Sequence, residues 1–136
     1  MTTDNCLRFP PTRAGFGAAH RAFAALLETW PITVDSRHDV QLVFDEIASN
    51  IMRYGGAHGD VNVRIAFRDG EVVLAFEDDG KPFDPCVHPE PPYPTSLDET
   101  PTGGRGIMLV RRLSSRMEYQ LTSAKRNLLT VAVPVR

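Results

Sequence analysis

The stretch DVQLVFDEIASNIMRY, residues 39–54, decides the fold because it predicts a helix with two different faces. Glu46 and Asn50 lie four residues apart on one side, with Arg53 a turn further on, so their side chains project as neighbours. Taken alone, the pair is typical of a solvated helix face, and a nucleotide site would also need a phosphate-binding element elsewhere. The apolar stripe on the other side comprises Val40, Val43, Phe44, Ile47, Ile51 and Tyr54.

The composition indicates one globular domain over residues 1–136, with 42% hydrophobic and 24% charged residues. A net charge of −2 gives no basic field that would attract nucleic acid or an anionic membrane. Cys6 and Cys86 lie far apart, and no signal peptide or membrane-spanning run is visible, so we expect reduced thiols in the cytoplasm. The four histidines lack the spacing of zinc ligands.

Hydrophobic periodicity predicts two elements before the central helix. A short strand at residues 6–9 ends at Pro10-Pro11, and an amphipathic helix follows over residues 13–30. Ser36 or Asp35 is expected to cap the central helix, and Gly55-Gly56 is expected to end it. The stripe that the first helix should bury comprises Phe16, Ala19, Phe23, Leu26, Leu27 and Trp30.

The second half of the chain predicts a hairpin, a loop, a third helix and two further strands. Alternating residues at 61–67 and 72–76 indicate two strands joined by a tight turn at Asp69-Gly70. A helical pattern over residues 107–116 precedes strands at 117–121 and 129–135. This order, β-α-α-β-β-loop-α-β-β, predicts a two-layer α/β sandwich: a mixed, mostly antiparallel sheet with helices on one face.

Residues 79–103 interrupt this regular pattern. Seven of the eleven prolines lie between Pro82 and Pro101, and neither helical nor strand periodicity persists there. Because long structureless connections in compact domains are usually functional or disordered, we interpret residues 84–103 as a lid.

Two further polar motifs flank this lid. Asp78, at a strand end, is followed by Gly80, and the pair suits a carboxylate that accepts from an exocyclic amine beneath a flat ring. Gly103-Gly104-Arg105-Gly106 opens a helix, where backbone N–H groups bind phosphate. An acidic turn and a glycine hinge are the corresponding purely structural interpretations. The sequence contains no GxxxxGK[ST] motif, and the glycine run follows a loop instead of a strand, which argues against a P-loop and a Rossmann site.

Together, these three motifs resemble the N, G1 and G2 boxes of the Bergerat (GHKL) ATP-binding fold. The small size, the DDGKPFDP run and the GGRGI run are most similar to stand-alone anti-sigma-factor serine kinases of the RsbW/SpoIIAB type. The resemblance extends from about Leu7 to Val135. Tyr54 stands where relatives often carry a histidine.

The resemblance implies a role for each motif residue in binding ATP. Asn50 matches the position that coordinates Mg²⁺, Glu46 the general base, and Asp78 with Gly80 the adenine site. The phosphate-binding end of the lid is matched by Gly104, Gly106 and Arg105. The family phosphorylates a serine on an anti-anti-sigma (STAS) partner and binds a sigma factor, and its members tend to form homodimers.

Other classes of protein share parts of this pattern. A sensor histidine kinase would need a phosphoacceptor helix hairpin before Asp39, and a topoisomerase or chaperone would need a transducer domain. The main alternative is a non-catalytic binding module of the same fold that uses ATP as a structural ligand or not at all. The third alternative is a two-layer sandwich that binds no nucleotide. An absence of thermal stabilisation by ATP would favour this alternative.

Overall fold

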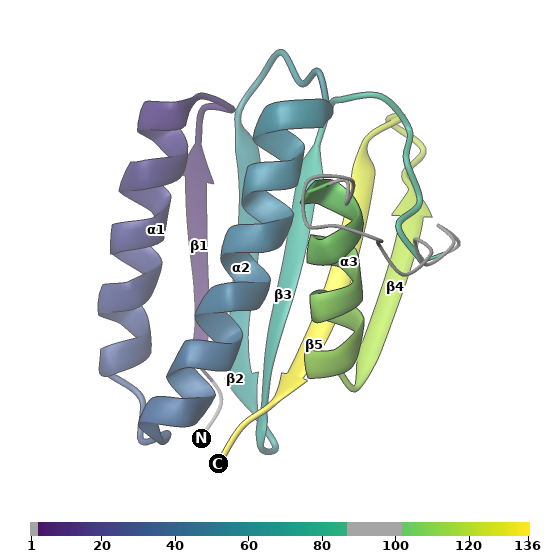
Figure 1. Ribbon diagram of the computed structural model, residues 1–136. Coiled ribbons are helices and arrows are strands. Elements are labelled where there is room, and N and C mark those ends of the chain that lie inside the picture. The colour runs from purple at the N-terminus through teal and green to yellow at the C-terminus, as the bar shows by residue number, and fades with distance from the viewer. Residues whose placement is uncertain (1–2, 87–101) are drawn as a thin grey trace.

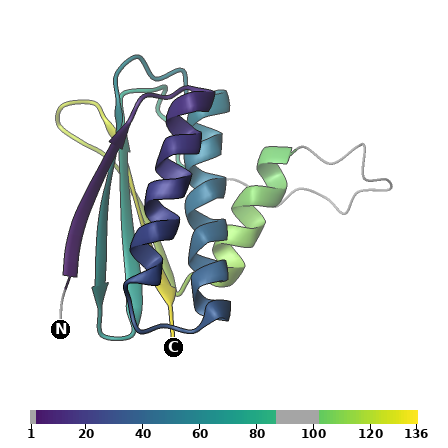
Figure 2. The ribbon, with the colours of Figure 1, turned by 90° about the vertical axis from the view of Figure 1, so that its left-hand side faces the viewer.

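The computed structural model describes residues 3–86 and 102–136. In this part of the chain, one sheet is covered on one face by three helices (Figures 1 and 2). This arrangement confirms the two-layer α/β sandwich and the predicted order of elements. The elements are β1 (Thr3–Phe9), α1 (Arg13–Glu28), α2 (Val34–Tyr54), β2 (Val61–Arg68), β3 (Glu71–Asp78), α3 (Thr102–Leu113), β4 (Arg116–Leu121) and β5 (Asn127–Pro134).

The sheet has the strand order β1-β2-β3-β5-β4, and each of its pairings is antiparallel. The expectation of a mixed sheet is therefore wrong for the described strands. The physical reason is the position of β5. The connection through α3 makes β4 run parallel to β3, but β5 turns back from β4 and lies between the two, so these parallel strands never pair.

The β2–β3 hairpin matches its sequence signal. Asp69 and Gly70 have φ angles of 52° and 74°, which are the left-handed values that a two-residue type I′ turn requires. The turn sets Arg68 opposite Glu71 and places Ile65 opposite Leu74 on the buried face. Sequence alternation alone was sufficient here because the turn and the hydrophobic pattern specify the same register.

Helix α2 lies at the centre of the core, where Phe44 stacks on Phe23 with ring centroids 4.3 Å apart. It begins at Val34, earlier than residue 39, and its N-cap is Thr33, whose side chain accepts from Ser36 N at 3.1 Å. The predicted caps Ser36 and Asp35 are therefore wrong. The first turn misleads because its apolar Val34 is 69% exposed while its polar Ser36 is buried.

Both ends of α2 are fastened to other parts of the chain. At the start, Arg136 O accepts from Thr33 N at 2.6 Å, and Ser36 Oγ accepts from Arg136 N at 2.9 Å. At the end, Gly56 has a φ of 65°, a left-handed conformation that favours glycine, as predicted. No helix in residues 3–86 or 102–136 is long and apolar enough to cross a membrane.

Candidate nucleotide-binding site

The first group of predicted site residues lies where α2 faces α3. A Cβ atom on Gly106 would overlap Glu46 Oε2 and would lie 3.6 Å from Asn50 Nδ2. Glycine at this position leaves the space beside α3 that the Glu46 carboxylate occupies. The structure therefore brings together Glu46, Asn50 and Gly106, which the sequence separates by as many as 60 positions. We call these three residues the helix-pair cluster.

One polar atom of the helix-pair cluster is buried without a partner among the described residues. This atom is Asn50 Oδ1, which no donor within residues 3–86 and 102–136 reaches. An unpaired buried acceptor costs about 1–3 kcal/mol, so such an atom calls for a physical explanation. An amide oxygen is a hard ligand of the kind that Mg²⁺ accepts, usually together with waters and substrate phosphates. The unpaired Asn50 oxygen therefore fits the magnesium position that the resemblance implies.

The described residues contain no group of three or more His, Cys, Asp or Glu side chains that would hold a metal ion. Among the other predicted residues, Gly104 and Arg105 lie in the first turn of α3, and the Arg105 side chain lies outside the described part of the structure.

A second group of residues lies at the end of β3. Asp78 is 5% exposed, and its Oδ1 accepts from Gly80 N at 2.8 Å. A Cβ atom on Gly80 would overlap the backbone oxygen of Gly55, and the next residue, Lys81, donates its N–H to that same oxygen at 2.8 Å. The end of β3 is thereby docked on the C-terminal end of α2.

Sequence reasoning missed two members of this second group, Asn127 and Tyr119. Asn127 opens β5 directly opposite Asp78 and donates from Nδ2 to Asp78 Oδ1 at 3.2 Å, and the Tyr119 hydroxyl of β4 donates to Asn127 Oδ1. The sequence did contain a signal for Asn127. It lies two residues before the buried Leu129 in β5, so the alternation of the strand places this polar residue on the buried face. We call Asp78, Gly80, Asn127 and Tyr119 the strand-end cluster.

Helix α2 connects the two clusters, because it carries residues of the first and its C-terminal cap contacts the second. Glu46 of the helix-pair cluster and Gly55, which receives the strand-end cluster, are nine residues apart on α2 and its cap. At 1.5 Å per residue this corresponds to about 14 Å along the helix axis. One helix thus sets the spacing between the two sets of polar groups.

The loop beside the strand-end cluster is held by a carboxylate. Asp79 accepts from His58 N at 2.8 Å and from Gly59 N at 3.0 Å. These hydrogen bonds, chiefly the one from His58, lower the pKa of Asp79 below its usual 3.8. The ionised Asp79 therefore links the turn that precedes β2 to the end of β3.

The start of the predicted lid is fastened to α3 and β4. Arg111 of α3 donates to the backbone oxygen of Pro85 at 2.7 Å, and the thiol of Cys86 contacts the backbone oxygen of Met117 at 3.6 Å. Burial, reinforced by the nearby Asp84, raises the pKa of the Cys86 thiol. Residues 87–101, the greater part of the predicted lid, lie outside the described residues.

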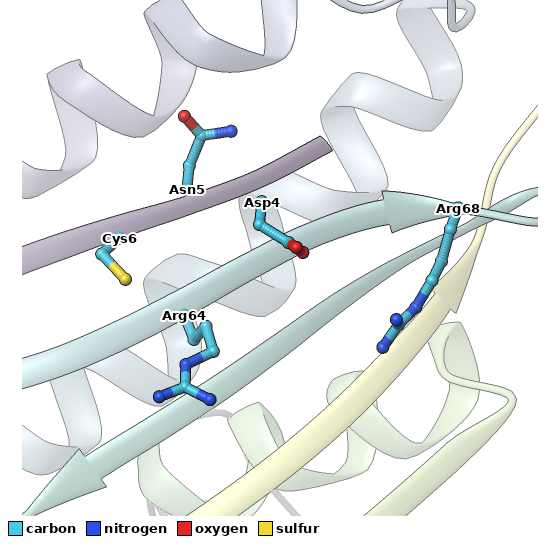
Figure 3. Close-up of a pocket in the computed structure, with 5 residues that line it drawn as sticks. All are labelled: Asp4, Asn5, Cys6, Arg64 and Arg68. Atoms are coloured by element: carbon cyan, nitrogen blue, oxygen red, sulfur yellow. The ribbon is translucent and has the colours of Figure 1, made fainter. Parts of the chain in front are cut away.

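A separate pocket lies on the sheet at β1 and β2 (Figure 3). None of the predicted site residues lines it. Figure 3 shows Cys6 and Asn5 pointing in opposite directions from β1, as neighbouring strand residues do. The lining residues are Asp4, Asn5, Cys6, Arg64 and Arg68.

Comparison with known proteins points to the same fold as the motifs. The sequence matches the histidine kinase-like ATPase domain family over residues 9–133. It is 29% identical over 99 residues to the serine/threonine-protein kinase BtrW of Bordetella bronchiseptica, covering 71% of this chain and 68% of that protein.

Two solved structures resemble this chain. The RsbU and RsbW domains of a Mycobacterium tuberculosis protein superpose with a TM-score of 0.70 at 14% identity, covering 98% of this chain and 32% of that longer chain. The SiaB-SiaC complex of Pseudomonas aeruginosa contains a chain that superposes with a TM-score of 0.61 at 18% identity, covering 97% of this chain and 89% of that one.

Because the family match spans almost the whole sequence, the chain belongs to the histidine kinase-like ATPase domain family. Its fold is the Bergerat (GHKL) fold, which confirms the resemblance seen in the sequence.

Proposed function

We propose that this chain is a protein serine/threonine kinase of the anti-sigma-factor type, which uses Mg-ATP. The observation that carries the proposal is the helix-pair cluster, where Gly106 brings α3 against Glu46 and Asn50, and Asn50 Oδ1 has no partner. The BtrW relative, a serine/threonine-protein kinase, supports the same activity.

Each cluster has its own part in nucleotide binding under this proposal. The carboxylate of Asp78 accepts the exocyclic amine of adenine, and Gly80 leaves room for the ring. Asn50 provides one oxygen ligand to a magnesium ion that neutralises the phosphate charge when it is bound. The N–H groups at the start of α3, where Gly104 and Arg105 lie in the first turn and Gly106 follows, are the proposed phosphate donors.

Glu46 is the proposed general base for phosphoryl transfer. Its carboxylate lies beside Gly106, next to the proposed metal ligand Asn50. It would accept the proton of the attacking serine hydroxyl as that oxygen bonds to the γ-phosphorus and ADP leaves. Phosphoryl transfer depends mainly on positioning and charge stabilisation, so a small set of groups is sufficient for it.

The proposed protein partners are an anti-anti-sigma (STAS) protein, as phosphoacceptor, and a sigma factor; both imply a cytoplasmic location. The relatives support partners of this kind, since one similar structure holds RsbU and RsbW domains and the other is a SiaB-SiaC complex. We further propose that the chain forms a homodimer.

The decisive test is transfer of labelled phosphate from ATP to a STAS acceptor by the wild type and by Glu46→Gln. We expect the variant to retain Mg-ATP binding and to lose transfer by about 10²- to 10⁴-fold, the usual contribution of a general base. Unchanged transfer by Glu46→Gln would show that Glu46 is not the base.

Asp45→Asn is the matched control, because it removes the neighbouring carboxylate from the same helix. Asp45 faces α1, where its oxygens lie 2.8 and 2.9 Å from His20 Nδ1, so we expect transfer to persist. If the wild type binds the acceptor and ATP but transfers no phosphate, the chain is instead a non-catalytic regulatory module.

A further inference from the structure

The amide of Asn127 is bonded on both sides, and its side chain is almost fully buried at 7% exposure. Its Nδ2 donates to Asp78 Oδ1 and Gly80 O, each at 3.2 Å, and to Lys81 O at 3.0 Å. Its Oδ1 accepts from Phe83 N at 3.3 Å and from the Tyr119 hydroxyl. This one side chain therefore joins β3, β4, β5 and the loop after β3.

The backbone partners fix the orientation of this amide. The carbonyl oxygens of Gly80 and Lys81 can only accept, and the N–H of Phe83 can only donate. A flipped amide would set its oxygen against two carbonyls and its NH₂ group against an N–H. Asn127 must therefore present an N–H, and not an oxygen, to Asp78.

In this orientation the two oxygens of Asp78 differ in their hydrogen bonding. Oδ1 accepts from both Gly80 N and Asn127 Nδ2. Oδ2 has no hydrogen-bond partner within residues 3–86 and 102–136, and it remains available as an acceptor. A purine with a 6-amino group offers a donor to such an oxygen, whereas a 6-oxo purine offers another acceptor.

We propose that Asn127 is a specificity-determining positioning residue that holds Asp78 with Oδ2 directed at the base, so that the site selects 6-amino purines. Tyr119 supports it by fixing the other end of the amide. The inference rests on the proposed nucleotide binding and deepens it, because it assigns contact with the base to Asp78 and the orientation of Asp78 to Asn127.

The experiment measures dissociation constants by calorimetry for three Mg-nucleotides: ATP, the triphosphate of unsubstituted purine riboside and ITP. Purine riboside lacks the 6-amino group, and ITP replaces it with an oxygen. For the wild type we expect ATP to bind about tenfold more tightly than purine riboside triphosphate, the worth of one hydrogen bond to a charged group, with ITP weaker still.

Asn127→Ala should lower the affinity for ATP by about tenfold and leave purine riboside triphosphate nearly unchanged, so that the selectivity ratio falls towards one. Tyr119→Phe should shift the selectivity ratio in the same direction by a smaller factor. This variant replaces Asn127→Ala in the test if Asn127→Ala does not fold. Asn62→Ala is the matched control: Asn62 accepts from Arg8 Nε in an exposed hydrogen bond. It pairs with Glu77, so its side chain lies on the opposite face of the sheet from that of Asp78, and its loss should leave the ratio unchanged.

A merely structural Asn127 would weaken all three nucleotides equally, and that result would overturn the inference, as would an unaltered ratio in both variants. Equal binding of the three nucleotides by the wild type would also overturn it while leaving the proposed function standing. If the wild type binds no nucleoside triphosphate, the proposed function itself fails.

Discussion

The helix-pair cluster and the strand-end cluster differ in how completely their polar atoms are bonded. In the strand-end cluster, the amide of Asn127 and one oxygen of Asp78 are fully engaged within the protein. In the helix-pair cluster, Asn50 Oδ1 is buried without a partner in the described part of the chain, and the Glu46 carboxylate lies beside Gly106. Helix α2 nevertheless contributes to both: it carries Glu46 and Asn50, and the oxygen of its C-cap Gly55 accepts from Lys81 N at the end of β3.

This difference teaches which part of the site is preorganised. A bonded network costs nothing further to order when a base binds, so it suits recognition of a rigid ring. An unpaired oxygen lowers the stability of the free protein, and that deficit is recovered when a cation or another donor arrives. We therefore expect substitutions in the two clusters to separate stability from activity.

Among substitutions that retain the Glu46 side chain, the largest effect on activity is expected from Gly106→Ala. The new methyl group would meet Glu46 Oε2, the far end of a flexible side chain, which can move aside. Alanine also favours a helix over glycine by about 1 kcal/mol, so the melting temperature should hold or rise. Displacement of the proposed base by about 1 Å should reduce phosphotransfer about 100-fold. Acceptor labelling and thermal melts measure the two effects, and a loss of both would contradict this separation.

Gly80→Ala should have the opposite signature. Here the methyl group would meet the backbone oxygen of Gly55, which cannot move without shifting the end of α2, and Asp78 Oδ1 at 2.9 Å. Such overpacking typically costs about 1–3 kcal/mol. Urea unfolding in the absence of nucleotide should detect this loss. A variant with wild-type stability would mean that the α2–β3 junction is looser than its contacts imply.

Asn50→Ala sharpens the comparison by removing the unpaired oxygen. Without nucleotide, the variant should be as stable as the wild type or up to about 1 kcal/mol more stable, because no hydrogen bond is lost. The dependence of ATP affinity on magnesium should disappear at the same time. Calorimetry with Mg²⁺ and with EDTA tests this, and a clear destabilisation of the free protein would show that the oxygen has a partner.

The smallest effect is expected from Asp79→Asn, and it depends on pH. The hydrogen bonds from His58 and Gly59 lower the folded-state pKa of Asp79, so the carboxylate stabilises the fold above the unfolded-state value near 3.8. This contribution is lost as the pH falls through the folded-state value. The stability difference between wild type and variant should thus be constant near neutrality, and it should disappear as the pH falls below 3.8 and through the lowered folded-state pKa. A constant difference down to pH 2 would contradict the shift.

The sequence predicted most of the fold because its signals are local. The Asp69-Gly70 turn and the alternation on both sides of it define the hairpin without any long-range information. The start of α2 was predicted incorrectly because Ser36 is buried by a contact with Arg136, a hundred residues away. The pairing of β5 with β3 is likewise set by packing that no local pattern encodes.

The candidate site was predictable only in part, for the same reason. Glu46, Asn50, Asp78 and the glycines are visible as short motifs. Asn127 is not, because its role depends on lying opposite Asp78 across two strands that are far apart in sequence. Only the register of the assembled sheet reveals it.

The contact between Arg136 and the first turn of α2 has a practical consequence for experiments. The backbone of Arg136 is hydrogen-bonded to Thr33 and Ser36, at the opposite end of α2 from Gly55. A helix of 21 residues is about 32 Å long. A fluorophore attached to the Arg136 side chain would therefore be held against the start of α2, remote from both clusters. It would report movements of α2 without obstructing the proposed nucleotide site.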